Sequence, residues 1–296
     1  MNHTVLPDEP ELHDALETEL GQPLTEAEPV SGGCIAHAMR LTTAADTYFL
    51  KWGRGAVAET FPGEAAGLKA LDAAGAPLRI PTVHTVASET ETRPGFLLME
   101  WIPPGDPAPT FMADLGTALA VLHRHTGAAY GFSQDNHIGR LPQVNPHETS
   151  WPDFFRAHRL RPQCKMARAR NRWRVDWDAP FERLCADLAN RLPEATEPSV
   201  VHGDLWKGNV MATHDGGAAL IDPATYYGHR EVDVAMTQLF GGFHASFYDA
   251  YRAAWPLLDG FDERVHIYNL YHVINHLNHF GGMYATQVEQ TLKQLT

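Results

Sequence analysis

The stretch VVHGDLWKGNVM, Val200 to Met211, begins as an apolar strand and becomes polar after two residues. Asp204 and Asn209 stand five positions apart in it, and a glycine precedes each of them. Two interpretations fit this pattern. One is a polar turn whose Asp and Asn side chains bond to the local backbone, and the other is a catalytic loop that follows a strand.

The residues after this stretch predict a β-hairpin. The apolar runs NVMAT and AALID flank HDGG, and Asp-Gly is a strong signal for a two-residue turn. If Asp215 and Gly216 form that turn, Asn209 pairs with Asp222, and opposed residues have Cβ atoms about 4.5–5.5 Å apart. A turn centred on Gly216 and Gly217 would shift the pairing by two residues but keep both groups near each other.

An amide oxygen and a carboxylate in this arrangement suit Mg²⁺, which prefers hard oxygen ligands. Asp204, then Asn209, then a hairpin and Asp222 follow the order of the catalytic base and the two metal ligands in protein kinases. Phosphoryl transfer requires a carboxylate at the acceptor hydroxyl and a metal at the phosphates, which explains the separation. This motif by itself leaves the polar turn open.

Four further features expected of a kinase occur in the right order. Lys51 lies late in the predicted strand TYFLKWG, and Glu64 lies in the first turn of a predicted helix that ends at Gly75. The turn SGGC supplies glycines over the nucleotide, and LLMEWIPPG supplies a backbone hinge for adenine. Together these features predict a kinase fold, with nucleotide-binding candidates Gly32, Gly33, Lys51, Glu64, Glu100, Trp101 and Ile102.

The chain divides at PPGDPAP, where proline and glycine oppose both helix and strand. Before it, the patterns predict a helix over residues 9–20 capped by Asp8, and strands over residues 30–41, 47–53, 79–88 and 95–102. After it, they predict helices over residues 110–127, 151–174, 177–191, 231–243, 247–255, 264–280 and 285–295. The predicted class is α+β and bilobal, with a small β-rich N-lobe (residues 1–102), a larger mainly helical C-lobe (residues 103–296) and a ligand cleft between them.

Composition narrows the classes of partner. The net charge is −13 over 296 residues, which argues against nucleic acid and anionic membranes. No apolar run of 18 residues predicts a membrane span. Three cysteines are too few and too far apart for a disulfide framework, and the N-terminus lacks a signal sequence, so we expect a reducing cytoplasm.

One segment is strongly basic. Eight of the 23 lysines and arginines fall between Arg156 and Arg174. A solvated helix face that balances acidic neighbours explains such a run. An anion-attracting patch near an active site is the alternative.

Several longer motifs resemble those of the fructosamine kinase family, whose members are also called ketosamine-3-kinases. They are HGDLWKGN, IDPATYYGHREVDVAM, LFGGF and LYHVINHLNHFG, and the motifs SGGCI, FPGEAAGLKAL, GFSQDNHIG and FFRAHRL extend the resemblance through nearly the whole chain. HGD…N is shared with aminoglycoside phosphotransferases and choline kinases, whereas DPATYYGHRE with LFGGF is more specific. The resemblance implies ATP-dependent phosphorylation of O3 of a ketoamine, such as a ribulosamine or fructosamine. The unstable 3-phosphate then releases the amine, which is deglycation.

By motif, the resemblance implies that Asp204 is the proton acceptor. Asn209 and Asp222 would hold Mg²⁺, and Lys51 with Glu64 would orient the phosphates of ATP. The polar residues that follow would organise the loop by hydrogen bonds: His229, Glu231 and Asp233.

Trp206 would pack against the substrate or, alternatively, be a buried structural tryptophan. Cys34 is either a small apolar residue under the glycine turn or, as the resemblance favours, a redox-sensitive thiol. Its oxidation, to a disulfide between the subunits of a homodimer, would block the nucleotide site. His272, His276 and His279 share a helix face without completing a metal-ligand set, so we expect packing roles for them.

Only eight residues separate Asp222 from Glu231, and the chain has no G-x-G-x-x-G, D-F-G or A-P-E motif. A long activation loop is therefore excluded, and a ketoamine, free or on a protein lysine, fits better than a peptide substrate. Two rivals stay open: an aminoglycoside- or choline-type phosphotransferase, and a nucleotide-binding pseudokinase. The presence of all five candidate catalytic and phosphate-site residues argues against the pseudokinase.

Overall fold

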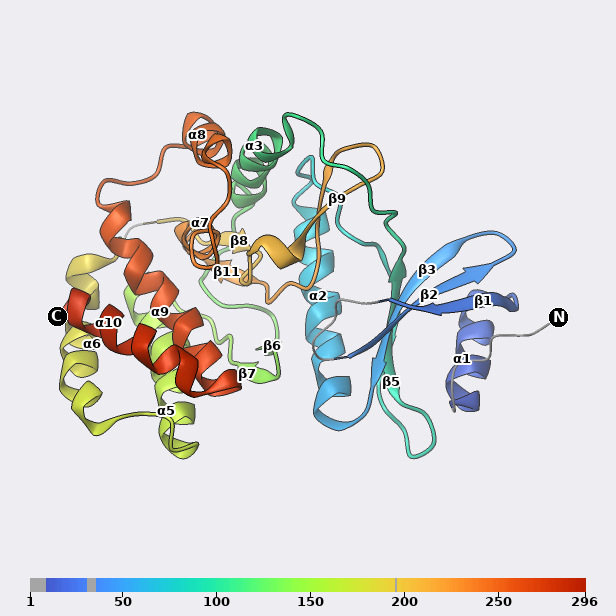
Figure 1. Ribbon diagram of the computed structural model, residues 1–296, viewed down its shortest axis with the longest axis horizontal. Coiled ribbons are helices and arrows are strands. Elements are labelled where there is room, and N and C mark those ends of the chain that lie inside the picture. The colour runs from blue at the N-terminus through green and yellow to red at the C-terminus, as the bar shows by residue number, and fades with distance from the viewer. Residues whose placement is uncertain (1–8, 31–35, 195) are drawn as a thin grey trace.

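A computed structural model describes residues 9–30, 36–194 and 196–296 of the chain. Its N-terminal part is an antiparallel sheet in the order β1-β2-β3-β5-β4, and helices make up most of the rest (Figure 1). The strands are β1 Leu24–Pro29, β2 His37–Thr43, β3 Thr47–Gly53, β4 Val83–Ala87 and β5 Gly95–Glu100, and the two helices that pack on them are α1 Pro10–Leu20 and α2 Phe61–Ala73.

The two helices cover opposite faces of this sheet. Leu98 of β5 belongs to a buried cluster with Leu16 of α1, whereas Leu97 belongs to the cluster that contains Leu68 of α2. Successive side chains of a strand point to opposite faces, which separates the two clusters. Lys51 pairs directly with Leu97, so β3 directs the side chain of Lys51 toward α2.

Strand β1 is missing from the sequence-based prediction. Its segment LTEAEP carries two glutamates, and only Leu24 and Ala27 are buried. The pairing with β2 is irregular between Leu24 and Glu26, which breaks the alternation that a strand prediction relies on. The strand lies at the sheet edge, where charged residues and proline are tolerated.

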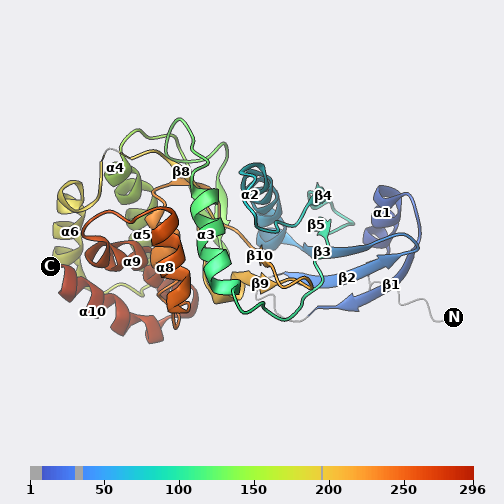
Figure 2. The same ribbon diagram turned by 90° about the horizontal axis from the view of Figure 1, so that it is seen from above.

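Helix α9 is the core of the C-terminal part. It buries 14 of its 20 residues, and α5, α7 and α10 pack against it, whereas α3 packs against α8 (Figures 1 and 2). Among the described residues, no helix is both long and apolar enough to cross a membrane. The helices here are α3 Phe111–His123, α4 Trp151–Phe155, α5 Arg161–Ala169, α6 Asp178–Arg191, α7 Glu231–Met236, α8 Ala245–Ala254, α9 Phe261–Phe280 and α10 Ala285–Leu295.

Three pairs of short strands connect these helices. They are β6 Asn136–Ile138 with β7 Leu141–Gln143, β8 Ser199–Val201 with β11 Tyr226–Gly228, and β9 Val210–Ala212 with β10 Ala218–Leu220. Short helical turns, of 3₁₀ or π type, lie at Gly55–Thr60, Arg156–Leu160, Val175–Trp177, Lys207–Asn209 and Gly282–Tyr284.

Two predicted helices are shorter than expected. The helix predicted over residues 151–174 consists of α4, a π-helical turn and α5. Pro162, in the first turn of α5, lacks the N–H that a continuous helix would use. The helix predicted over residues 231–243 ends at Met236, and Gly241 and Gly242 follow with φ of 91° and 70°.

The basic segment is largely neutralised by its neighbours. Arg161 lies 2.8 Å from Glu182, and Arg168 lies 2.5 Å from Asp178. Two further arginines donate to carbonyl groups at the C-terminal end of α9, where the helix dipole favours cations. These contacts confirm a charge-balanced helix face.

Candidate active site

Lys51 lies between two carboxylates from distant parts of the chain. Its Nζ is 2.6 Å from Oε1 of Glu64 and 2.5 Å from Oδ1 of Asp222. Glu64 stands in the first turn of α2, on the side to which β3 directs Lys51. Burial opposes the charge of Lys51, but Asp222 and Glu64 outweigh burial and raise its pKa above the ordinary value. The structure thus brings these three predicted residues into direct contact.

The hairpin between Asn209 and Asp222 differs from the predicted one. Ala212 pairs with Ala218, and Thr213 donates its backbone N–H to the carbonyl of Gly217 at 2.9 Å. The loop therefore has three residues, 214–216, and ends in the left-handed Gly216, a common alternative to the two-residue turn. Ile221 donates its backbone N–H to the carbonyl of Asn209 at 3.1 Å. The predicted pairing of Asn209 with Asp222 is therefore wrong by one residue.

Asn209 still reaches both carboxylate-bearing segments. Its Nδ2 is 2.8 Å from the carbonyl oxygen of Asp204, 3.2 Å from Oδ2 of Asp204 and 3.4 Å from the carbonyl oxygen of Asp222. Both hydrogens of the Asn209 amide are thus used in hydrogen bonds, and its Oδ1 is available to bind a metal ion. Asp222 adopts a φ of 56°, a strained conformation that costs about 1–3 kcal/mol and is concentrated at functional sites. Oδ1 of Asn209 and the Asp222 carboxylate fit Mg²⁺.

The loop that carries Asp204 is held by the buried Asp233 of α7. The Asp233 carboxylate accepts the backbone N–H of His202 at 2.7 Å and of Gly203 at 2.9 Å, and Nε2 of His123 lies 3.1 Å away. Burial raises the pKa of Asp204 to about 7. A carboxylate with a raised pKa is a better proton acceptor. The expected role of Asp233 in organising this loop is confirmed.

The two other polar residues after Asp222 also have structural contacts. Glu231 receives two hydrogen bonds from Arg264 of α9, at 2.7 and 2.8 Å. Nδ1 of His229 lies 3.3 Å from the hydroxyl of Tyr268. Both contacts join the segment at the start of α7 to α9, and both residues make hydrogen bonds, as the sequence predicts.

The β6–β7 hairpin holds the segment after Asp222. Nδ2 of Asn136 donates to the carbonyl of Thr225 at 2.8 Å, and Nε2 of Gln143 donates to the carbonyl of Ala224 at 3.0 Å. Helix α2 presses against the same hairpin, because a Cβ at Gly63 would come within 2.7 Å of Cβ of Asn136. The hairpin therefore links α2 to the segment that follows Asp222.

Sequence reasoning missed Asn136 and Gln143. Their signal is weak: two amide side chains at the ends of NHIGRLPQ, on either side of a turn that contains Gly139. They pair across the hairpin and are buried, and buried amides usually satisfy backbone groups.

Trp206 is exposed in the loop that follows β8, at 38% of its full surface. Its ring lies over Gly208, where a Cβ would come within 2.4 Å of the indole. The alternative of a buried structural tryptophan is therefore wrong. Contact between Trp206 and the substrate stays a prediction.

The predicted nucleotide hinge follows the end of β5. Glu100 forms an ion pair with Arg79, and Trp101 and Ile102 continue toward the helical part. A cavity of about 490 Å³ lies between the turn before β4, this segment and the β9–β10 hairpin, and its lining includes Arg79, Glu100, Ile102, Pro103 and His214. The other nucleotide candidates, Gly32 and Gly33, and the adjoining Cys34 lie outside the described residues.

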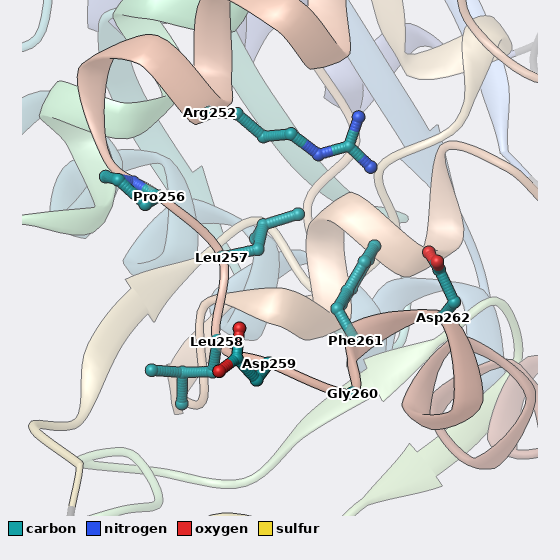
Figure 3. A pocket seen from close by; sticks show the side chains of 8 residues that line it. All are labelled: Arg252, Pro256, Leu257, Leu258, Asp259, Gly260, Phe261 and Asp262. Carbon is teal, nitrogen blue, oxygen red and sulfur yellow. The ribbon is translucent and has the colours of Figure 1, made fainter.

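A second cavity, of about 300 Å³, lies between α8 and the start of α9 (Figure 3). It is lined by Arg252 and residues 256–262, none of which is a predicted site residue. The histidines of α9 lie elsewhere: His276 contacts the backbone carbonyl of His272, and His279 that of Ile138. These contacts agree with packing roles.

Comparisons with known proteins extend this description. A fructosamine kinase family model matches residues 9–296. A candidate ketoamine kinase of Enterococcus faecium is 40% identical over 266 residues, which cover 90% of this chain and 93% of that protein. The protein-ribulosamine 3-kinase of Arabidopsis thaliana is 36% identical over 269 residues, which cover 89% of this chain and 80% of that protein.

Solved structures show the same likeness. A candidate fructosamine-3-kinase of Thermobifida fusca YX-ER1 superposes with a TM-score of 0.83 at 29% identity, covering 100% of this chain and 99% of the other. An aminoglycoside phosphotransferase in complex with ADP and hygromycin B shares the fold alone, with a TM-score of 0.62 at 16% identity over 96% of this chain and 98% of the other. These likenesses confirm the predicted fold class.

Proposed function

Because the chain belongs to the fructosamine kinase family, we propose that it uses ATP to phosphorylate the O3 hydroxyl of a ketosamine. The observation that carries this proposal is the position of Lys51 at 2.6 Å from Glu64 and 2.5 Å from Asp222. Such a contact joins the phosphate-binding lysine, its helix partner and a metal ligand in a kinase site. Decomposition of the 3-phosphate would then free the amine.

The acceptor hydroxyl is activated by Asp204. In the reaction, O3 attacks the γ-phosphorus of ATP, the bond from that phosphorus to ADP breaks, and the hydroxyl proton passes to Asp204. The raised pKa of Asp204, caused by burial, supports this role. Asp233 keeps the carboxylate in place through the backbone of His202 and Gly203.

Asn209 and Asp222 are the residues that would hold Mg²⁺. When bound, this ion neutralises charge that develops on the transferred phosphoryl group. Lys51 orients the phosphates, and Glu64 keeps Lys51 charged and in position. For the nucleotide, the backbone of Glu100, Trp101 and Ile102 binds adenine, and Gly32 with Gly33 covers the phosphates.

An aminoglycoside- or choline-type acceptor is the second candidate. The aminoglycoside phosphotransferase quoted above is only 16% identical, so its likeness supports the fold and leaves the acceptor open. The ketoamine and ribulosamine kinases are 36–40% identical over most of the chain. That difference favours a ketosamine acceptor.

The test is ADP release with Mg-ATP and one acceptor at a time. The acceptors are ribulose-lysine, fructose-lysine, choline and kanamycin. We expect turnover on the two ketosamines, and its loss in Asp204→Asn with ATP binding retained. Asp249→Asn, which changes an exposed carboxylate of α8, is the matched control.

Each outcome has a distinct meaning. Turnover on kanamycin or choline alone would overturn the acceptor but keep the mechanism. ATP binding without turnover on any acceptor would favour the pseudokinase. An unchanged rate in Asp204→Asn would show that another group accepts the proton.

A further inference from the structure

Five aromatic rings run without a gap from the catalytic loop to the end of α9. Between ring centroids, Phe240 is 6.0 Å from Trp206 and 4.7 Å from His276. His276 is in turn 5.6 Å from Phe280 and 5.0 Å from Tyr284. We call these five residues the aromatic strip. Because they come from four separate segments of the chain, the tertiary fold gathers them.

The strip is exposed to solvent at both ends, and its middle members Phe240, His276 and Tyr284 are half-buried. Trp206 exposes 38% of its surface and Phe280 exposes 65%, and the adjoining Met283 exposes 80%. Grouped large apolar side chains on a protein surface commonly mark a binding site. The end at Phe280 and Met283 is the more exposed, so a ligand there could continue into solvent.

The other end of the strip meets the proposed reaction centre. Trp206 lies two residues after Asp204, and its backbone N–H donates to the carbonyl of Asp204 at 3.2 Å. The acceptor hydroxyl must lie at Asp204. Of the five strip residues, Trp206 is the one in contact with the Asp204 loop, so a substituent that extends from the sugar toward the strip would meet Trp206 first and then Phe240.

His276 gives the middle of the strip a polar atom. Nδ1 of His276 is 2.8 Å from the carbonyl oxygen of His272. A carbonyl only accepts, so Nδ1 carries the hydrogen and Nε2 of the neutral ring is an acceptor. Burial lowers the pKa of His276, which keeps the ring neutral at pH 7. A neutral ring among aromatic faces attracts a cation instead of repelling it.

These properties match one part of a ketosamine. Its nitrogen is attached to C1, two carbons from the C3 that carries O3, and it is a secondary amine that is cationic when protonated. Resting on the function proposed above, we propose that the aromatic strip binds the nitrogen and alkyl chain of the acceptor amine. Aromatic faces bind ammonium groups and methylene chains alike. The net charge of −13 also favours a cationic acceptor.

The test compares three ketosamines that differ only beyond the nitrogen. They are the fructose adducts of methylamine, of Nα-acetyl-lysine amide and of an unstructured peptide with one lysine. The variant is Phe280→Ala with Met283→Ala. Val175→Ala is the control, because Val175 is 86% exposed in a separate helical turn. KM and kcat come from ADP release, and Kd comes from calorimetric titration without ATP.

We expect the double variant to raise KM and Kd for the lysine and peptide adducts about fivefold, through lost apolar contact. The methylamine adduct, which is too short to reach Phe280, keeps its KM, and kcat is unchanged for all three. Equal effects on all three adducts, or none, would overturn the inference while the proposed function stood. Strip-dependent binding without turnover would support the inference and overturn the proposed function. Absence of binding by all three adducts would overturn both.

A second variant tests the polar atom. His276→Phe keeps a ring in the strip but lacks Nε2. We expect it to raise KM about fivefold for all three adducts, which share the nitrogen, and to leave kcat and the KM for ATP unchanged. An unchanged KM would show that Nε2 does not contact the acceptor nitrogen and would overturn that part of the assignment.

Discussion

The backbone N–H of Gly203 donates to Oδ1 of Asp233 at 2.9 Å, directly before the proposed proton acceptor. Gly203 has a φ of 81°, and a Cβ there would lie 2.2 Å from the carbonyl oxygen of Ala224. Only glycine fits such a position. The placement of Asp204 thus depends on contacts made by its neighbours as well as by its own side chain.

The Asp233→Asn substitution is expected to lower kcat at least tenfold. The amide keeps the size of the carboxylate, but its NH₂ group cannot accept a hydrogen bond from His202 or Gly203. A buried donor left unpaired costs about 1–3 kcal/mol of unfolding free energy. ADP release measures kcat, and urea unfolding measures the free energy of unfolding. The control is Asp187→Asn, which changes a half-buried carboxylate of α6. An unchanged kcat with reduced stability would show that Asp233 is structural only.

Lys51→Met is expected to reduce kcat/KM for ATP about 100-fold. The change removes the cation between Glu64 and Asp222 and so the charge that orients the phosphates. Steady-state kinetics with varied ATP measure the effect. Lys69→Met, at an exposed position of α2, the helix that carries Glu64, should behave as the wild type. A loss confined to the KM for the ketosamine would contradict the assignment.

Gly63→Ala is expected to lower kcat and raise the KM for ATP severalfold. Alanine is favoured over glycine within a helix by about 1 kcal/mol, but its Cβ would lie 2.7 Å from that of Asn136 and displace α2. Gly282→Ala is the control, because a Cβ there meets nothing within 4 Å. Wild-type kinetics with a higher Tm would mean that α2 moves without disturbing Lys51.

Stability is expected to fall as the pH falls below about 6.5, the pKa of a histidine in an unfolded chain. Burial lowers the pKa of both His229 and His272 to about 3. As the pH falls, the unfolded state therefore binds protons at these histidines that the folded state does not bind, and this difference lowers the free energy of unfolding. From pH 7 to pH 5, each histidine should remove roughly 2 kcal/mol of unfolding free energy. Urea unfolding at both pH values measures this loss of unfolding free energy. In His272→Asn the loss should be smaller by roughly 2 kcal/mol, the contribution of one histidine. A flat profile would contradict the prediction.

Peroxide is expected to inactivate the wild type but not Cys34→Ala. Burial raises the pKa of Cys164 to about 12 and of Cys185 to about 11, so neither forms the reactive thiolate readily. Residual activity after peroxide treatment is the measurement. The redox prediction fails if Cys34→Ala is inactivated as quickly as the wild type.

Residues with charge and a fixed order along the chain were predictable. Lys51 and Glu64 each stand on an element with a clear pattern, Asp222 follows one closely, and phosphoryl transfer in a kinase requires all three charges together. The hairpin register was not predictable to one residue, because Asp215-Gly216 and a three-residue loop that ends in left-handed Gly216 have the same sequence signals.

Features that depend on tertiary packing were harder to predict. Asn136 acts on the backbone of Thr225, 89 positions away, and no local pattern records such a contact. The edge strand β1 lacks regular alternation, because its pairing with β2 shifts register between Leu24 and Glu26. The aromatic strip is likewise invisible in the sequence, where Trp206 and His276 stand 70 residues apart.

The eight residues between Asp222 and Glu231 have a consequence for control. Part of this stretch pairs as β11 with β8, and Asn136 and Gln143 hold its carbonyl groups. Among the described residues, contacts within the chain therefore hold this segment in place without a ligand, and the segment is too short to form a loop that phosphorylation could order.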